Sequence, residues 1–241
     1  MTEREQVLLE TGFILHQRPY RNSSQLLECL TATHGRVGLV ARGSRQTKSR
    51  RRALLQPFLP LRLSWLRRGE LGRLIEVEPE GPGFAFDSHR LLAGYYGNEL
   101  LLRLLARGDP NGEVFSCYSR CLARLAAGES MARTLRLFEL ELLGALGYGL
   151  DLDTDAASGE PIAADQCYRF ELENGLRVTE RANDAEVYSG RELISLREQA
   201  LDDEASLRTA QRLLGRVLKA YLGERPLKSR LVLQDIVSRG L

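Results

Sequence analysis

The sequence predicts an α+β protein of more than one domain, with a small β-barrel at the N-terminus and a helical domain after it. Three observations support this prediction. Short strand-like segments fill the first eighty residues, helical spacing of apolar residues begins near residue 87, and a polar, irregular stretch interrupts the helical part. The chain has 241 residues, of which 43% are hydrophobic and 27% charged, so it can bury a sizeable core.

The predicted barrel covers residues 1–80. Leu61, Leu63 and Trp65 alternate with Arg62, Ser64 and Leu66, which is the period of two that places the first three side chains on one face of a strand. Five short strands leave no room for crossover helices, so an antiparallel barrel is expected. The strands are expected at Val7–Gln17, Gln25–Ala32, Arg36–Ala41, Leu61–Leu66 and Gly72–Val77.

Helical periodicity covers most of the remaining chain. Residues 81–149 form the first part of the predicted helical domain and residues 189–241 its C-terminal part. The first helix follows Asp87 or Ser88, and a capping box at Ser189–Glu192 opens a later one. Further helices are expected at Val114–Leu125, Ala132–Leu146, Leu207–Tyr221 and Arg230–Val237.

Residues 150–188 separate these two helical parts. They are polar and irregular, with one strand-like run at Cys167–Leu172. We therefore expect an inserted subdomain.

Charge is distributed unevenly along the chain. The net charge is only +2, yet the first 75 residues hold 14 Lys or Arg against 5 Asp or Glu. Six cations and no acid lie within Arg42–Arg52, which cannot pack as core and predicts an exposed loop. A loop that is merely solvated is the alternative, but a run of like charge favours a polyanionic partner. We interpret the chain as a nucleic-acid-binding protein whose loop binds phosphates.

Aromatic side chains near this loop could stack on bases. Tyr20 stands beside Arg18 and Arg21 and is the better candidate, whereas Phe58 and Trp65 have the pattern of core residues.

The sequence carries no signature of an enzyme. Its three histidines, His16, His34 and His89, lie in different settings, and no nucleophile motif accompanies them. Asn98 and Glu99 interrupt an apolar helix, where they could be catalytic or could tie helices together, and we favour the structural role. We expect a non-enzymatic protein without a cofactor.

Neither a signal sequence nor a membrane span is recognisable in the chain, so a cytoplasmic location is expected.

The helix around residues 133–143 carries cations near an apolar face. Most of that face is expected to be core, but its cationic side could bind an acidic peptide with a hydrophobic end in a groove. The candidate residues for this peptide site are Arg133, Arg136, Phe138 and Leu142.

Several segments together resemble the RecO family of bacterial DNA-repair proteins. The resemblance runs from about Val7 to Arg230, and the segments occur in the family's order and spacing. The segments are Gly35–Arg45, Leu55–Pro60, Tyr95–Leu100, Arg136–Gly149, Ser158–Pro161 and Pro226–Arg230.

This resemblance implies an N-terminal OB-fold, a helical domain and an inserted zinc-ribbon-like subdomain. It implies a recombination mediator that binds single- and double-stranded DNA and anneals complementary strands. With RecR, such a protein helps to load RecA onto DNA coated by single-strand binding protein, whose acidic tail it captures. The protein would be a monomer alone and associate with the nucleoid when acting. The DNA-binding candidates are Arg18, Arg21, Arg36, Arg42, Arg45, Lys48, Arg50, Arg51, Arg52, Lys228 and Arg230.

Two other interpretations stay open. An OB-fold protein could bind RNA, because charge and a barrel do not distinguish DNA from RNA. The basic loop could instead dock an acidic protein, which would make the chain an interaction adaptor. The affinities for matched DNA and RNA oligonucleotides distinguish DNA binding from RNA binding. Binding of a protein partner without any binding of nucleic acid would favour the adaptor.

We predict that the purified protein carries no stoichiometric zinc. Many family members hold zinc with four cysteines in the insertion, but Asp155 and Ser158 occupy the positions of the first pair and Cys167 is the single cysteine of residues 150–188. The remaining cysteines, Cys29, Cys117 and Cys121, lie outside the insertion. Elemental analysis that finds about one zinc per chain would contradict the prediction.

Overall fold

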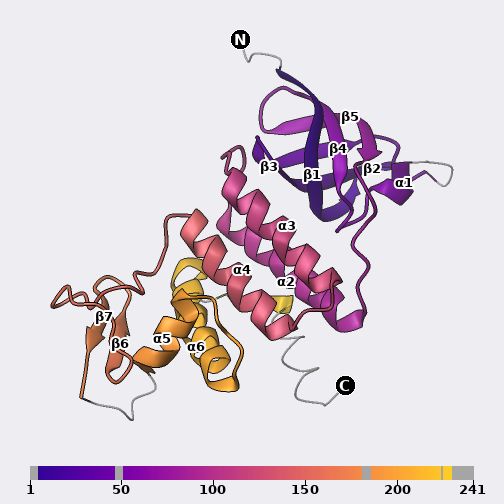
Figure 1. The fold of residues 1–241 in the computed structure, drawn as a ribbon. Helices are drawn as coiled ribbons and strands as arrows, with labels where there is room; N and C mark the ends of the chain where they lie inside the picture. The colour runs from indigo at the N-terminus through magenta and orange to yellow at the C-terminus, as the bar shows by residue number, and fades with distance from the viewer. Residues whose placement is uncertain (1–4, 47–50, 181–185, 224, 230–241) are drawn as a thin grey trace. The chain divides into compact units, whose positions relative to one another are not determined.

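The computed structural model describes residues 5–46, 51–180, 186–223 and 225–229 (Figure 1). The chain forms two compact units, one of residues 1–128 with 226–241 and one of residues 129–225. The expected last helix at Arg230–Val237 lies outside the described residues. Within the described part of the chain, no helix is long and apolar enough to cross a membrane.

Five strands of the first unit close into a barrel in the order β1-β2-β3-β5-β4 (Figure 1). The five expected strands are confirmed, but the expectation of a wholly antiparallel barrel is wrong because β3 and β5 run parallel. A closed barrel with an odd number of strands cannot alternate direction throughout, so one pair must be parallel. The strands are β1 (Glu5–Tyr20), β2 (Ser24–Thr31), β3 (Gly35–Ala41), β4 (Leu61–Arg67) and β5 (Leu71–Pro79).

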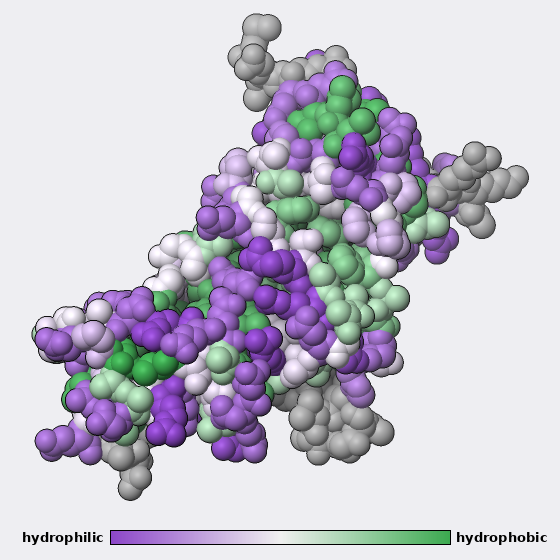
Figure 2. All heavy atoms as spheres, viewed as in Figure 1, coloured by the Kyte–Doolittle hydropathy of each residue, from purple (hydrophilic) through white to green (hydrophobic). Residues whose placement is uncertain are grey.

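The barrel interior is filled by one apolar cluster. Leu61, Leu63 and Trp65 are at most 1% exposed and pack with Ile14 and Leu39, as the alternating pattern predicted. On the outside, Figure 2 shows a largely hydrophilic surface with apolar patches. Exposed aliphatic side chains of the barrel include Leu8, Leu9 and Ile75.

Two helices complete the described core of the first unit. Helix α2 (Ser88–Leu104) begins at the N-cap Asp87, and α3 (Gly112–Ala126) begins at the N-cap Asn111. Buried Asn98 of α2 donates to the carbonyl of Leu15 at 2.9 Å and accepts from the hydroxyl of Tyr118. Because this amide joins β1, α2 and α3, the structural role favoured for Asn98 is confirmed.

A carboxylate between two arginines joins the barrel to the end of α2. Glu28 accepts from Arg36 Nε at 3.0 Å and from Arg107 Nε at 3.2 Å. Arg36 Nη1 also donates to the carbonyls of Leu102 and Leu105 at 2.7 and 2.9 Å. These carbonyls belong to the helix C-terminus, where backbone acceptors otherwise lack partners. Glu28, Arg36 and Arg107 form what we call the Glu28 cluster.

The second unit contains three helices and a small sheet. Helices α4 (Met131–Ala145), α5 (Gly190–Arg197) and α6 (Glu204–Leu222) accompany a sheet ordered β7-β6-β8. Its strands are β6 (Cys167–Glu171), β7 (Gly175–Val178) and β8 (Val187–Ser189), of which the sequence predicted only the first. The compact units therefore group α4 with α5 and α6, and the barrel with α2 and α3.

The expected capping box at Ser189–Glu192 does not form. Ser189 is the N-cap of α5, but its side chain makes no capping hydrogen bond. The Glu192 carboxylate instead accepts a hydrogen bond from the Thr209 hydroxyl of α6. Tertiary packing between α5 and α6 thus competes with the local cap.

We expect Glu28→Gln to lower the free energy of unfolding by about 1–3 kcal/mol, because three charge-assisted hydrogen bonds to this buried carboxylate lose their anion. Burial raises the pKa of Glu28, but hydrogen bonds from Arg107 and Arg36 outweigh burial and hold this pKa below its ordinary value. The stabilisation by the Glu28 carboxylate is therefore present above pH ~4 and is lost as the pH falls through the lowered pKa. Urea denaturation at neutral and acidic pH measures it.

The matched control is Glu76→Gln, which changes an exposed carboxylate of β5. It should alter stability by less than about 0.5 kcal/mol. A Glu28→Gln protein as stable as the wild type at neutral pH would show that the cluster does not stabilise the unit.

Candidate nucleic-acid interface

Exposed arginines gather around the turn that joins β1 to β2. Arg18 lies near the end of β1, and Arg21 occupies the turn with a φ of +53°. The loop after β3 packs against the same turn, since the backbone N–H of Arg45 donates to the carbonyl of Ser23 at 3.0 Å. Arg42 begins that loop and is exposed.

Arg51 and Arg52 follow within a few residues. They are exposed and open the four-residue helix α1 (Arg51–Leu54), so this end of the expected loop is helical. We call Arg18, Arg21, Arg42, Arg45, Arg51 and Arg52 the basic edge. Lys48 and Arg50 lie outside the described residues.

The basic edge is not neutralised by acidic neighbours. Across the described residues, none of its six arginines has a carboxylate within ion-pair distance. Arg45 makes only long contacts, of 3.4 and 3.5 Å, to the carbonyls of Arg21 and Asn22. The guanidinium of Arg21 lies 5.4 Å from the ring centroid of half-buried Tyr20. Unpaired, hydrated guanidinium groups at one edge are suited to phosphate binding.

Other predicted DNA-binding residues have different surroundings. Arg36 is only 17% exposed in its side chain and belongs to the Glu28 cluster, so we do not include it in the basic edge. Lys228 is exposed beside α2, where its backbone N–H donates to Glu99 at 3.0 Å. Ser229 also donates to Glu99, through its N–H at 2.9 Å and its hydroxyl at 2.6 Å. Arg230 lies outside the described residues.

Two of the aromatic candidates are buried. Trp65 is 1% and Phe58 4% exposed, so neither is an open stacking platform. Tyr20 remains the accessible candidate.

The expected peptide groove on α4 is not open. Phe138 and Leu142 are 1% and 0% exposed, and they belong to the core. Arg136 pairs with Glu139 at 2.6 Å, and Arg133 donates to the carbonyl of Gln199 at 3.0 Å. The apolar face of this helix is packed in the core, as most of it was expected to be, so Phe138 and Leu142 are not open to a peptide in the described structure.

A carboxylate organises the inserted subdomain at the position where related proteins were expected to have cysteine. Asp155 accepts from the N–H groups of Ala157 at 2.6 Å, Ser158 at 3.3 Å and Val178 at 3.0 Å. These bonds fold the 155–158 turn and attach it to β7. In the described part of the chain, no group of three or more His, Cys, Asp or Glu side chains is arranged to hold a metal ion.

Comparison with known proteins matches both halves of the chain to models of one protein family. Residues 6–82 match the family model described as "Recombination protein O N terminal", and residues 85–231 match "Recombination protein O C terminal". A DNA repair protein RecO of Nitrosococcus oceani is 44% identical over 95% of this chain and 94% of its own length. The RecO protein of Coxiella burnetii is 43% identical over 95% of this chain and 98% of its own length. That of Methylococcus capsulatus is 42% identical over 93% of this chain and 92% of its own length.

We expect Asp155→Ala to destabilise the second unit by about 1–3 kcal/mol, because three backbone N–H groups lose their acceptor. The backbone hydrogen bond from Ala157 is the main cause that lowers the pKa of Asp155, and bonds from Val178 and Ser158 add to it. Since the pKa is lowered by folding, the stabilisation is present above pH ~4 and lost below it. Hydrogen exchange of residues 155–178 reports the effect locally.

Asp165→Ala is the control, because it removes an exposed carboxylate of the same insertion. Unchanged exchange protection in Asp155→Ala would rule out the carboxylate as the organising group.

Proposed function

Since this chain belongs to the RecO family of DNA repair proteins, with a role in DNA repair and recombination, we propose that it is a non-enzymatic recombination mediator. It binds single- and double-stranded DNA and anneals complementary strands. With RecR it helps to load RecA onto DNA coated by single-strand binding protein. The observation that carries the proposal is the basic edge, whose six arginines have no carboxylate partner among the described residues.

The barrel is inferred to be an OB-fold. Its five strands close in the order β1-β2-β3-β5-β4, and the β1–β2 turn is one of the loops with which OB-folds bind oligonucleotides. Arg21 lies in that turn, and Arg45 packs on it. The basic edge therefore lies where an OB-fold would bind a strand.

The insertion is inferred to be the counterpart of a zinc-ribbon-like element. Its sheet β7-β6-β8 and the Asp155 turn supply a small structured element, in which hydrogen bonds to the carboxylate replace thiolate ligands. The acidic tail of single-strand binding protein is not placed on α4, because Phe138 and Leu142 are buried there.

RNA binding is the competing function at the same edge. Arginine contacts to phosphate do not read the 2′-hydroxyl, so the basic edge alone accepts either nucleic acid. The family's role in DNA repair favours DNA.

We expect the double variant Arg42→Ala/Arg45→Ala to bind single-stranded DNA more weakly and with less salt dependence. Each phosphate contact contributes about 0.7 to the slope of log affinity against log salt, so two lost contacts flatten the slope by up to about 1.4. Fluorescence anisotropy across a salt series measures this slope. Annealing of complementary strands coated by single-strand binding protein should slow in parallel.

Arg73→Ala/Arg191→Ala is a control with the same charge change, because both arginines are exposed and lie outside the basic edge. This variant should keep the wild-type slope. A double variant of Arg42 and Arg45 with wild-type affinity and slope would remove the basic edge from DNA binding. Tighter binding of a matched RNA than of DNA would favour the competing function.

A further inference from the structure

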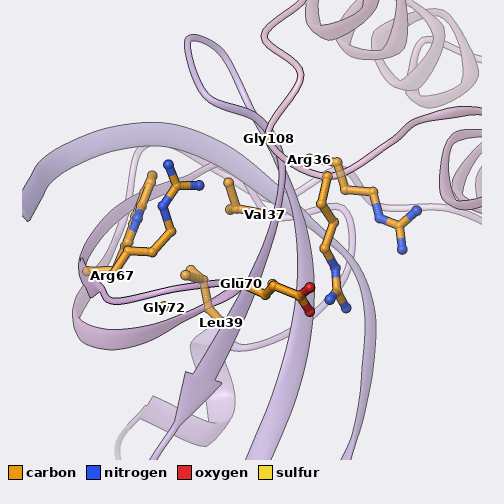
Figure 3. A pocket seen from close by; sticks show the side chains of 10 residues that line it. Arg36, Val37, Leu39, Arg67, Glu70, Gly72 and Gly108 are labelled. Carbon is orange, nitrogen blue, oxygen red and sulfur yellow. The ribbon is translucent and has the colours of Figure 1, made fainter. Parts of the chain in front are cut away.

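A cavity of about 290 Å³ opens in the barrel wall where β3 meets β5 (Figure 3). Parallel pairing of these strands extends only from Gly38 with Leu71 to Val40 with Arg73. Earlier in β3, Arg36 pairs instead with the segment after α2, where the N–H of Gly108 donates to the Arg36 carbonyl at 2.8 Å. The cavity lies where β3 changes partner.

The cavity combines apolar and polar lining. Val37, Leu39 and Trp65 are at most 3% exposed and form its apolar part. Arg67 and Glu70 supply polar groups from the end of β4 and the turn after it, and Figure 3 shows them at different sides of the lining.

Two glycines allow the side chains to lie close to the backbone. A Cβ at Gly38 would come within 3.2 Å of the Arg107 guanidinium carbon. A Cβ at Gly72 would come within 3.0 Å of Trp65 Cδ1. The Arg107 guanidinium and the Trp65 indole therefore lie directly against the backbone of Gly38 and Gly72, respectively.

One buried donor at this cavity has no acceptor. The indole N–H of Trp65 is buried, and among the described residues no atom accepts a hydrogen bond from it. Buried tryptophan N–H groups ordinarily find a partner, because an unsatisfied donor costs free energy. Trp65 Cδ1, the atom next to this nitrogen, is the one that faces Gly72 of the cavity lining.

Charge at the cavity argues against a phosphate. Arg67 donates to Glu5 at 2.7 Å, and Arg107 is held by Glu28, so both cations are already compensated. Glu70 is exposed and would repel an anion, and no hydrogen bond to its carboxylate occurs among the described residues. The cavity lining therefore combines two guanidinium groups that already have acidic partners, an indole whose buried N–H lacks an acceptor among the described residues, and the exposed Glu70 carboxylate.

We propose that this cavity binds a nucleobase that carries an exocyclic amino group, from a single strand held on the basic edge. Its volume is near the lower limit for ligand pockets, which suits one base. Guanidinium planes stack on bases, and a glutamate accepts from the amino group of cytosine. Arg36 at the cavity and Arg42 at the basic edge lie at the two ends of β3, roughly 20 Å apart along an extended strand. A single strand held on the basic edge can therefore reach the cavity. The inference rests on the proposed DNA binding and adds base preference to it.

Trp65 is the single tryptophan of the chain and lines this cavity, so its fluorescence is a probe of the cavity. Deoxycytidine and thymidine are titrated into the full-length protein, and then oligonucleotides of cytosine or thymine only. We expect saturable quenching that is stronger with deoxycytidine, and tighter binding of the cytosine oligonucleotide by roughly fivefold or more.

The decisive variant is Glu70→Gln. If Glu70 merely repels the strand, its neutralisation tightens binding of both oligonucleotides. If Glu70 accepts from the base, binding of the cytosine oligonucleotide weakens while the salt slope stays at its wild-type value, because no phosphate contact is lost. Glu76→Gln, an exposed acid of β5 outside the cavity, is the matched control and should not weaken cytosine binding.

The outcomes separate the two proposals. Two results would overturn the base site and leave DNA binding intact. One is salt-dependent binding of oligonucleotides without quenching of Trp65 fluorescence. The other is a Glu70→Gln variant that binds the cytosine oligonucleotide as tightly as the wild type, or more tightly. Absence of binding by both nucleosides and oligonucleotides overturns both.

Discussion

The Glu28 cluster is the interaction on which the first unit depends. A single carboxylate on β2 orients Arg36 of β3 and Arg107 of the segment after α2, and Arg36 satisfies two carbonyls at the end of that helix. Since Glu28 is buried and the Arg36 side chain is 17% exposed, removal of the anion would leave a largely buried guanidinium group, together with that of the more exposed Arg107, without compensation. The cluster therefore fixes how α2 joins the barrel, and with it the place of the cavity beside Arg107.

Pairing divides the arginines of the barrel into two kinds. Arg36, Arg67 and Arg107 are bound to acids and hold strands and segments together. The arginines of the basic edge lack such acids in the described structure and remain exposed. Only the second kind can neutralise phosphate without first breaking a bond within the protein. A count of basic residues cannot make this distinction, because it depends on which acids lie nearby in space.

The insertion illustrates how one carboxylate can organise a turn. Asp155 accepts three backbone N–H groups from the two segments that it joins. Thiolates would draw such segments together through a shared ion, whereas a carboxylate does so by direct hydrogen bonds. The consequence is sensitivity to acid, because protonation of the carboxylate weakens these hydrogen bonds.

The sequence by itself determined the five barrel strands, most helices and the exposure of the arginines near residue 42, because these follow from local periodicity, capping and charge. It also carried the family resemblance, which the comparisons confirm. Tertiary structure alone decided that β3 and β5 run parallel, that Phe138 and Leu142 are buried, and that Arg107 pairs with Glu28. Each of these outcomes depends on groups far apart in the chain, and local patterns contain no information on such contacts.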